Sequence, residues 1–414
     1  MPLLSMSTPP YDLFSRAFKA NPFPTFAIMR EADPIYPHLA PNGTTIWYIT
    51  RYEDVIACLR DNEHFVKDIR QALPPEQLTP ARRTTMHQLI NENMLFADPP
   101  DHTRLRALVS QAFTPRRIEN LRPRLHQLAQ VLLEQVAPLG HMDLIADYAL
   151  PLPVVIIADL LGIPEADRTA VADWSQAIIS PGSRGHTYKA RKHKVRALVT
   201  YLRELFKERG ARPQDDLITA LVQAEMAGDK LSEAELSSMV ALLIVTGHET
   251  TVNLIGNGAL ALLTHPAQRA LVQENPALLA QAIEELLRFD GPVESSTTRW
   301  VGQTFTYKGF TLNRGDVVRL VFTSANRDAA AFDHPNTLDI TRPDNKHLAF
   351  GLGIHYCLGA PLARLEGEIA FHTLFHYFPT LQLAVPPEQL LWRSGVLFRG
   401  LQGLPVCWEV KNLA

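Results

Sequence analysis

Cysteine is scarce in this sequence. The 414 residues include three cysteines, Cys58, Cys357 and Cys407. An odd number in so long a chain argues against a disulfide framework and fits a reducing compartment better. Residues 1–10 contain no basic stretch followed by an apolar core, which a secretion signal would need. We therefore expect a cytoplasmic protein with reduced cysteines.

The sequence also lacks an excess of charge and a long apolar run. The net charge is −3 and there is no Lys/Arg-rich tail, so the composition does not indicate binding to nucleic acid. The longest apolar stretch, 148–163, is interrupted by Pro151, Pro153 and Asp159. It falls short of the roughly 18 uninterrupted apolar residues that a membrane helix requires. We expect a protein with no membrane span and no nucleic-acid partner.

Repeats, linkers and appended modules are missing as well. With 46% hydrophobic and 20% charged residues, the chain has an ordinary globular composition and can bury a large core. Two regions favour strands: 34–50, where Asn42-Gly43 supplies a hairpin turn, and 297–321. The segments 118–136 and 148–161 favour helices. We expect residues 1–414 to form a single domain.

One cysteine lies in a stretch that is rich in glycine. Residues 350–360 read FGLGIHYCLGA, and Cys357 comes just before a helical pattern over 361–376. A cysteine at the start of a helix has its pKa lowered, because the helix dipole and free N–H groups favour the thiolate, and the nearby Gly353 and Gly359 permit a close backbone approach. A single thiolate suits a haem iron, whereas zinc would need three or four clustered protein ligands. The alternative is a buried, inert thiol, which is the commoner role of a lone cysteine.

A second stretch places polar residues inside an apolar helix. Residues 239–251 read MVALLIVTGHETT, in a helical pattern that starts at 231–233 and ends at 265–266. Buried polar groups in such a place must be satisfied or functional. A zinc-protease motif is excluded, because Val252 stands where the second His of His-Glu-x-x-His would be. The alternative is a structural patch whose side chains bond to carbonyls four residues earlier.

The pattern Phe-x-x-Gly-x-x-x-Cys-x-Gly in residues 350–359 resembles the haem-binding loop of the cytochrome P-450 monooxygenases at all four fixed positions. Other motifs of that family follow in the expected order, and the resemblance covers nearly the whole chain. It implies a mainly α fold with a smaller β region, and haem b (iron protoporphyrin IX) held between the long central helix and the Cys357 loop. Cys357 would ligate the iron. The loop residues that would bind the haem are Phe350, Gly351, Gly353, His355 and Gly359.

Basic residues outside the loop match the family's contacts to the haem propionates. In the stretch DPPDHTRLR, His102 and Arg106 lie four apart on one face of a helix that Asp98 or Asp101 can cap. From the residues alone, two donors one turn apart could hold a pair of carboxylates, but a basic helix face is usually just solvated. The resemblance implies that both side chains donate to a propionate. It gives the same role to Arg299 and His355.

The resemblance assigns the polar cluster in 246–251 to oxygen activation. It implies that Gly247 opens the helix beside bound oxygen, that Thr250 hydrogen-bonds this oxygen and that Glu249 supplies protons through water. Cleavage of the O–O bond needs protons delivered into an otherwise dry pocket. Thr246 departs from the family, which usually has Ala or Gly there, and would narrow the pocket or bond a substrate. The pocket walls that we expect are Phe96, Leu243, Thr246, Val293 and Ser296.

Two more segments fit the family. Glu285 and Arg288 match its Glu-x-x-Arg motif, for which Arg342 is the expected partner. We expect a buried network that braces the Cys357 loop and serves folding. Segment 180–185 would belong to a lid over the substrate channel.

Together these motifs predict a soluble, bacterial-type haem-thiolate monooxygenase. It would activate O₂ with two electrons and hydroxylate or epoxidise a hydrophobic small molecule. No flavin or ferredoxin module is visible in the sequence, so we expect a monomer that receives electrons from NAD(P)H through a separate ferredoxin and ferredoxin reductase. Two alternatives share the haem loop: a peroxide-driven peroxygenase, which usually lacks the acid–Thr pair, and a non-enzymatic haem sensor.

Overall fold

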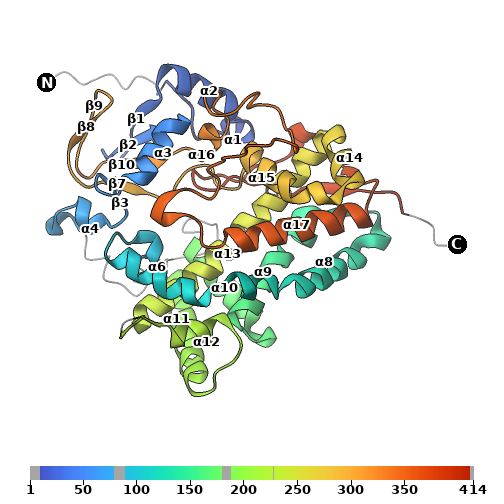
Figure 1. Ribbon diagram of the computed structural model, residues 1–414, viewed down its shortest axis with the longest axis horizontal. Helices are drawn as coiled ribbons and strands as arrows, with labels where there is room; N and C mark the ends of the chain where they lie inside the picture. The colour runs from blue at the N-terminus through green and yellow to red at the C-terminus, as the bar shows by residue number, and fades with distance from the viewer. Residues whose placement is uncertain (1–9, 79–88, 180–187, 227, 411–414) are drawn as a thin grey trace.

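A strand-rich region and a larger helical region make up the fold (Figure 1). The computed structural model describes residues 10–78, 89–179, 188–226 and 228–410. Helices predominate, and the predicted fold class is confirmed. The strands of the main sheet lie beside the first three helices at the upper left of Figure 1, while the longer helices fill the rest of the view. The predicted lid segment, 180–185, lies outside the described residues.

The main sheet has five strands in the order β1-β2-β10-β7-β3. β1 (Ile35–Leu39) and β2 (Thr45–Ile49) form the hairpin predicted for 34–50, and Gly43 turns the chain with φ +81°. β10 (Val317–Leu320) runs parallel to β2 and antiparallel to β7 (Arg299–Val301), which pairs in turn with β3 (Phe65–Val66). This order places Arg299 beside the segment that follows β3.

The strand-rich region 297–321 contains a reversal that the sequence pattern did not resolve. β8 (Phe305–Tyr307) and β9 (Phe310–Leu312) form a separate hairpin between β7 and β10. Its turn residues, Lys308 and Gly309, have φ values of +47° and +87°. Such a turn usually carries Asn-Gly or Asp-Gly, and Lys-Gly is a weaker signal. The remaining strands are β4 (His141–Asp143), β5 (Glu225–Met226), β6 (Asp229–Lys230), β11 (Gln382–Leu383) and β12 (Pro405–Cys407).

The helices follow the predicted segments with two adjustments. The segment 118–136 is divided into α7 (Pro115–Glu119) and α8 (Arg122–Val136), and 148–161 begins with a π-helical turn, Ile145–Ala149, before α9 (Pro151–Leu161). The other helices are α1 (Arg16–Ala20), α2 (Phe23–Ala32), α3 (Tyr52–Arg60), α4 (Ile69–Ala72), α6 (Asp101–Ala112), α10 (Arg168–Ile179), α11 (Tyr188–Ala211), α12 (Leu217–Gln223), α13 (Glu233–Thr264), α14 (Pro266–Glu274), α15 (Leu279–Asp290), α16 (Phe322–Ala325) and α17 (Ala360–Tyr377).

The long helix α13 crosses the centre of the molecule (Figure 1). Its predicted ends are confirmed: Ser232 and Glu235 form a capping box at its start, and Pro266 follows its end. It packs against α9, α15 and α17. Among the described helices, α13 is long and apolar enough to cross a membrane, but 67% of its most apolar window is buried inside the fold. Its apolar character therefore serves the protein core.

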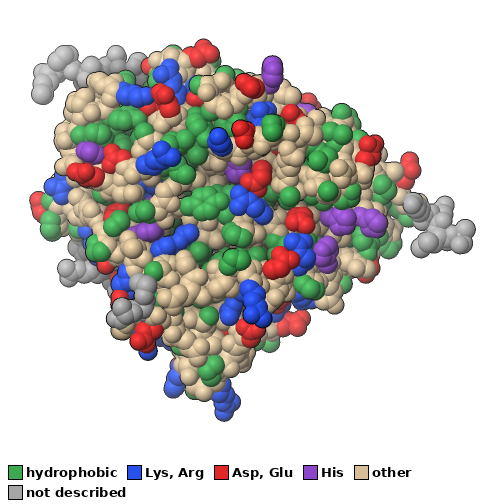
Figure 2. All heavy atoms as spheres, in the orientation of Figure 1, with side chains coloured by type: hydrophobic (Ala, Val, Ile, Leu, Met, Phe, Trp, Pro, Cys, Tyr) green, Lys and Arg blue, Asp and Glu red, His purple; other side chains and the backbone are tan. Residues whose placement is uncertain are grey.

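Charge is evenly distributed over the face seen in Figure 2. Acidic and basic side chains alternate there, and neither sign forms a continuous field. This agrees with the small net charge of −3.

Candidate active site

A central cavity lies between α13 and the loop that precedes α17. Its volume is about 470 Å³, and most of its lining is apolar. The fold brings most of the predicted site residues to it from distant parts of the sequence. They are Phe96, His102, Arg106, Leu243, Thr246, Gly247, Thr250, Val293, Ser296, Arg299, Phe350, Gly351, His355, Cys357 and Gly359. Two predicted residues, Glu249 and Gly353, are not among the described residues that line it.

Backbone hydrogen bonds shape the Cys357 loop. The amide of Cys357 donates to the carbonyl of Phe350 at 2.9 Å, and the amide of Gly351 donates to that of Leu348 at 2.8 Å. Gly351 has φ +70°, a conformation that favours glycine. The guanidinium of Arg364 lies 4.6 Å from the centre of the Phe350 ring. The loop therefore holds Phe350 next to Cys357, as the resemblance implied.

Gly353 makes a close backbone approach of the kind that the sequence predicted. Its φ is +75°, and a Cβ atom there would lie 2.9 Å from the carbonyl oxygen of Leu59 in α3. The close approach that requires a glycine is thus between the loop and α3, and Gly353 itself is not among the described residues that line the cavity.

The prediction that Cys357 has a lowered pKa is wrong for the protein without a bound cation. Burial raises the pKa of the thiol, although the backbone N–H groups of Gly359 and Ala360 and the charge of Arg106 act in the opposite direction. The residue nevertheless keeps accessible surface, and it lines the cavity. The start of the helix is therefore insufficient to favour the thiolate, and a cation on the cavity side would supply the missing stabilisation.

Buried basic side chains with unpaired nitrogen atoms lie along one edge of the cavity. His102 is 2% exposed, and neither of its ring nitrogens has a hydrogen-bond partner among the described residues. Nε2 of His355 and Nε of Arg299 are also buried and unpaired, and the rings of His102 and His355 lie 4.3 Å apart. Buried donors without acceptors are costly. This edge fits a ligand with carboxylate groups, and haem carries two.

The pKa values of these side chains also indicate that this edge of the cavity fits a ligand with carboxylate groups. Burial and the charge of Arg106 lower the pKa of His102, and burial together with the charges of Lys67 and Arg299 lowers the pKa of His355 to about 2. Burial lowers the pKa of Arg299 to about 10. Each shift shows that positive charge is disfavoured here in the absence of an anion. The residues present therefore fit the cofactor that the resemblance implies.

The aspartates before α6 do not cap this helix. The helix begins at Asp101 without a side-chain cap. The carboxylate of Asp98 instead accepts hydrogen bonds from the backbone amides of Lys67, at 2.9 Å, and Asp68, at 2.8 Å. The predicted cap is wrong because Asp98 ties α6 to the end of β3.

Within the polar cluster of α13, Thr246 and Thr250 line the cavity. Thr246 Oγ1 donates to the carbonyl of Leu242 at 2.8 Å, and Thr250 Oγ1 donates to the carbonyl of Thr246 at 3.1 Å. The helix is continuous, so the opening expected at Gly247 is not observed. A Cβ atom at Gly247 would lie 2.8 Å from the side chain of Ile157, which shows that this glycine admits α9. The bonding to carbonyls four residues earlier, the structural alternative, is present alongside the exposure of both hydroxyls to the cavity.

Glu249 is not among the described residues that line the cavity. Its carboxylate forms an ion pair with Arg393. The neighbouring imidazole of His248 donates through Nδ1 to the carbonyl of Ile244 at 2.7 Å. The acid next to Thr250 is therefore held by a cation from the C-terminal part of the chain.

A different acid, which is fully buried, does line the cavity. Glu366 of α17 is completely buried and lines the cavity, and it accepts a hydrogen bond of 2.8 Å from Thr251 Oγ1. Burial raises the pKa of Glu366 to about 8, and the bond from Thr251 only partly opposes this shift. The sequence reading did not single out this residue, because a lone Glu in an amphipathic helix gives no signal of its partner 115 positions away.

Comparison with known proteins decides the family. The sequence model of the cytochrome P-450 family matches residues 171–399. The polyketide biosynthesis cytochrome P-450 PksS of Bacillus subtilis is 44% identical over 94% of this chain and 96% of its own, and its solved structure superposes with a TM-score of 0.90 at 42% identity over 96% of this chain and 100% of that one. The chain belongs to the cytochrome P-450 family.

Two other members of this family show how widely the similarity extends. The vitamin D(3) 25-hydroxylase of Pseudonocardia autotrophica is 43% identical over 98% of both chains. A myxobacterial cytochrome P-450 solved with myristic acid has a TM-score of 0.88 at 42% identity, over 96% of this chain and 98% of that one. The protein is therefore a haem-dependent oxidoreductase of the monooxygenase type, as predicted.

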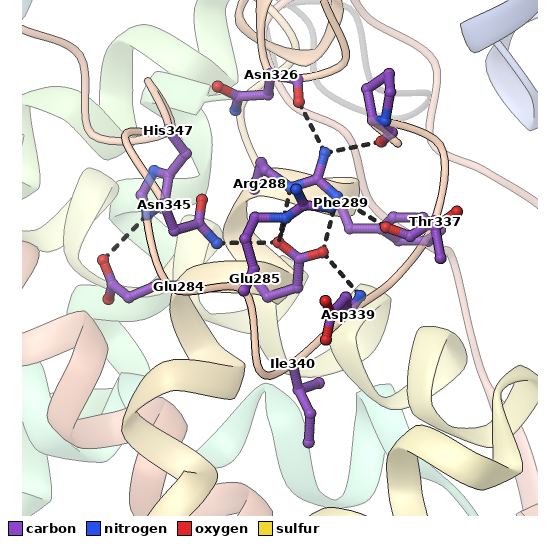
Figure 3. Close-up of polar contacts among 12 residues, drawn as sticks. Glu284, Glu285, Arg288, Phe289, Asn326, Thr337, Asp339, Ile340, Asn345 and His347 are labelled. Atoms are coloured by element: carbon purple, nitrogen blue, oxygen red, sulfur yellow. Dashed lines mark hydrogen bonds and ion pairs between the residues drawn. The ribbon is translucent and has the colours of Figure 1, made fainter. Parts of the chain in front are cut away.

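The Glu285 network of this cytochrome P-450 lies beneath the loop that leads to Cys357 (Figure 3). Arg288 donates to both carboxylate oxygens of Glu285 at 2.7 Å, and Arg342 Nε donates to the same carboxylate at 3.2 Å. All three residues are buried. Asn345 Nδ2 and the amide of Asp339 add further bonds to Glu285, each of 2.9 Å. The structure thus places the three predicted residues together and adds partners that spacing alone did not reveal.

Proposed function

We propose that this cytochrome P-450 hydroxylates or epoxidises a hydrophobic small molecule. The observation that carries the proposal is the cavity itself: it is mostly apolar, and both Cys357 and Thr250 line it. The relatives point in the same direction, since they include a vitamin D(3) 25-hydroxylase, a polyketide biosynthesis enzyme and a protein crystallised with myristic acid.

The haem would be held by residues of three kinds. Cys357 would supply the sulfur ligand, Phe350, Gly351 and Gly359 would contact the ring, and His102, Arg106, Arg299 and His355 would bind its carboxylates. When bound, haem supplies the iron centre that activates O₂ with two electrons.

The chain's own residues exclude water and supply protons. Apolar walls such as Leu243 and Val293 keep the cavity dry and orient an apolar substrate. Thr250 presents a hydroxyl that can exchange one hydrogen-bond partner for another, and Glu249 replenishes its proton through water when the ion pair with Arg393 loosens. Thr246, one turn earlier, narrows the cavity or accepts a hydrogen bond from the substrate.

Electrons are proposed to come from NAD(P)H through a separate ferredoxin and ferredoxin reductase. The matched relatives span nearly the whole of these 414 residues, so the cytochrome P-450 domain accounts for them. We place the enzyme in the cytoplasm as a monomer in which residues 1–414 act as one catalytic domain.

The test is a comparison of electron sources on the purified holoenzyme. A library of hydrophobic molecules is first screened by the shift of the haem Soret band, and the best ligands are then incubated with ferredoxin, reductase and NAD(P)H, or with H₂O₂ alone. The proposal is supported if oxygenated product forms with ferredoxin, reductase and NAD(P)H and does not form with H₂O₂ alone. Efficient product formation with H₂O₂ alone would identify a peroxygenase, and CO binding without product under either supply would identify a sensor.

A further inference from the structure

Lys67 is a buried cation without an acidic partner at the edge of the haem cavity. It follows β3, is 4% exposed and lines the cavity. Its Nζ donates to the carbonyls of Thr297 and Thr298, at 3.1 and 3.2 Å, and to the Thr297 hydroxyl. All of these acceptors are neutral, and no ion pair involves Lys67 within the described part of the chain.

The surroundings of Lys67 carry more positive than negative charge. Arg299 lies close enough that its charge, added to the effect of burial, holds the pKa of Lys67 well below its usual value. The one acid that opposes this effect is Asp98, whose carboxylate is already bonded to the backbone amides of Lys67 and Asp68. A buried ammonium that lacks a counter-ion is unfavourable, because neutral acceptors replace only part of its hydration energy.

The other titratable groups near Lys67 do not neutralise this excess of positive charge. His355 and Arg106 also line the cavity, and after burial the charges of Lys67 and Arg106 are among the causes that lower the pKa of His355. The edge therefore gathers the cations Lys67, Arg106 and Arg299 around a single engaged carboxylate. Two further carboxylates would bring this cluster close to neutrality, and they would have to enter through the cavity.

We propose that Lys67 binds a carboxylate of the haem together with Arg299. Sequence reasoning did not find it, because one lysine between a strand and an aspartate has no motif. The inference rests on the haem-binding role proposed above, which already assigns carboxylate contacts to two histidines and two arginines. Lys67 adds a primary ammonium, a compact charge that can turn from its threonine acceptors to an incoming anion.

The experiment measures haem loss from the holoenzyme. Wild type, Lys67→Met and Lys67→Arg are each mixed with excess apomyoglobin, and the rate of haem transfer is followed. Lys346→Met is the matched control, because it removes the same charge from an exposed position outside the cavity. We expect Lys67→Met to lose haem about 10- to 100-fold faster, as for a lost charge-assisted hydrogen bond. Lys67→Arg should stay within about threefold of wild type and Lys346→Met should not change.

A second cofactor separates carboxylate binding from packing. The same proteins are reconstituted with haem dimethyl ester, which has the same ring but no carboxylate charge. With the ester, wild type and Lys67→Met should lose cofactor at equal rates. The proposal is overturned if Lys67→Met speeds the loss of both cofactors by the same factor. It is also overturned if Lys67→Met does not speed the loss of native haem. If Lys67→Met does not fold, Lys67→Gln is measured in its place by the same two-cofactor comparison, and a wild type that takes up no haem would count against the proposed function instead.

Discussion

Thr251 of α13 and Glu366 of α17 are joined by a buried hydrogen bond of 2.8 Å. The bond connects the long central helix to the helix that follows the Cys357 loop. Burial raises the pKa of Glu366 to about 8, above the ordinary value of 4.5. The folded protein therefore keeps this proton over a pH range in which the unfolded chain releases it.

This pair predicts a pH-dependent stability. Because the pKa of Glu366 is raised on folding, its contribution is fully present below about pH 4.5 and is lost as the pH rises through about 8. The loss approaches about 1.4 kcal/mol per pH unit within that window. Glu366→Gln cannot titrate, so the difference in unfolding free energy between wild type and the variant should shrink from pH 5.5 to pH 7.5 in urea titrations. A constant difference across these pH values would show that Glu366 ionises normally.

The Glu285 network predicts a large stability difference between two similar ion pairs. Glu285 and Arg288 form a pair three residues apart that is fully buried, whereas the pair of Glu119 and Arg122 has the same spacing but is largely exposed. Removing one partner of a buried pair leaves an uncompensated charge, so Glu285→Gln should cost about 3–5 kcal/mol of unfolding free energy. Glu119→Gln should cost less than about 1 kcal/mol. Urea unfolding of both variants checks this, and equal costs would contradict the bracing role.

We expect replacement of Thr250 to uncouple NAD(P)H consumption from product formation. Its hydroxyl faces the cavity and bonds to the carbonyl of Thr246 at 3.1 Å. Thr250→Ala removes the group that we propose to pass protons, so reductant consumption should continue while product per NAD(P)H falls by about tenfold or more and hydrogen peroxide is released. Thr264→Ala is the control, because Thr264 bonds to a carbonyl of the same helix in the same way but lies at its far end. Unchanged coupling in Thr250→Ala would remove this residue from the proton path.

Local signals in the sequence were sufficient for the elements that frame the site. The capping residues Ser232 and Glu235 and the proline after His265 set the ends of α13, and the glycines around Cys357 set the loop. These local signals could not predict contacts between residues that lie far apart in the sequence. Arg393 pairs with Glu249 across 144 residues, and no short-range pattern announces it.

The pKa of Cys357 is a second property that the local sequence could not predict. A helix start predicts a lowered pKa, yet burial by segments from the whole chain raises it. The close approach predicted at Gly353 has a partner that only the folded chain reveals, because Leu59 occupies the space where a Cβ would lie. Sequence reasoning thus found which residues gather at the site and missed how burial and distant partners change their chemistry.

Thr246 predicts how the cavity selects its ligands. Its side chain lines the cavity and donates its hydrogen to the carbonyl of Leu242, so its oxygen remains free to accept a bond from a ligand. Thr246→Ala enlarges the cavity by roughly the volume of two heavy atoms, and ligands with an added methyl group near α13 should gain affinity by about tenfold or more. Thr246→Val keeps the shape and removes the acceptor, so it should weaken ligands that carry a hydroxyl donor and leave their deoxy analogues unchanged. Dissociation constants from Soret titrations of matched ligand pairs test both statements. If both variants shift all ligands equally, the threonine contributes neither shape nor hydrogen bonding to selection, and its departure from the family's small residue has no consequence for the substrate.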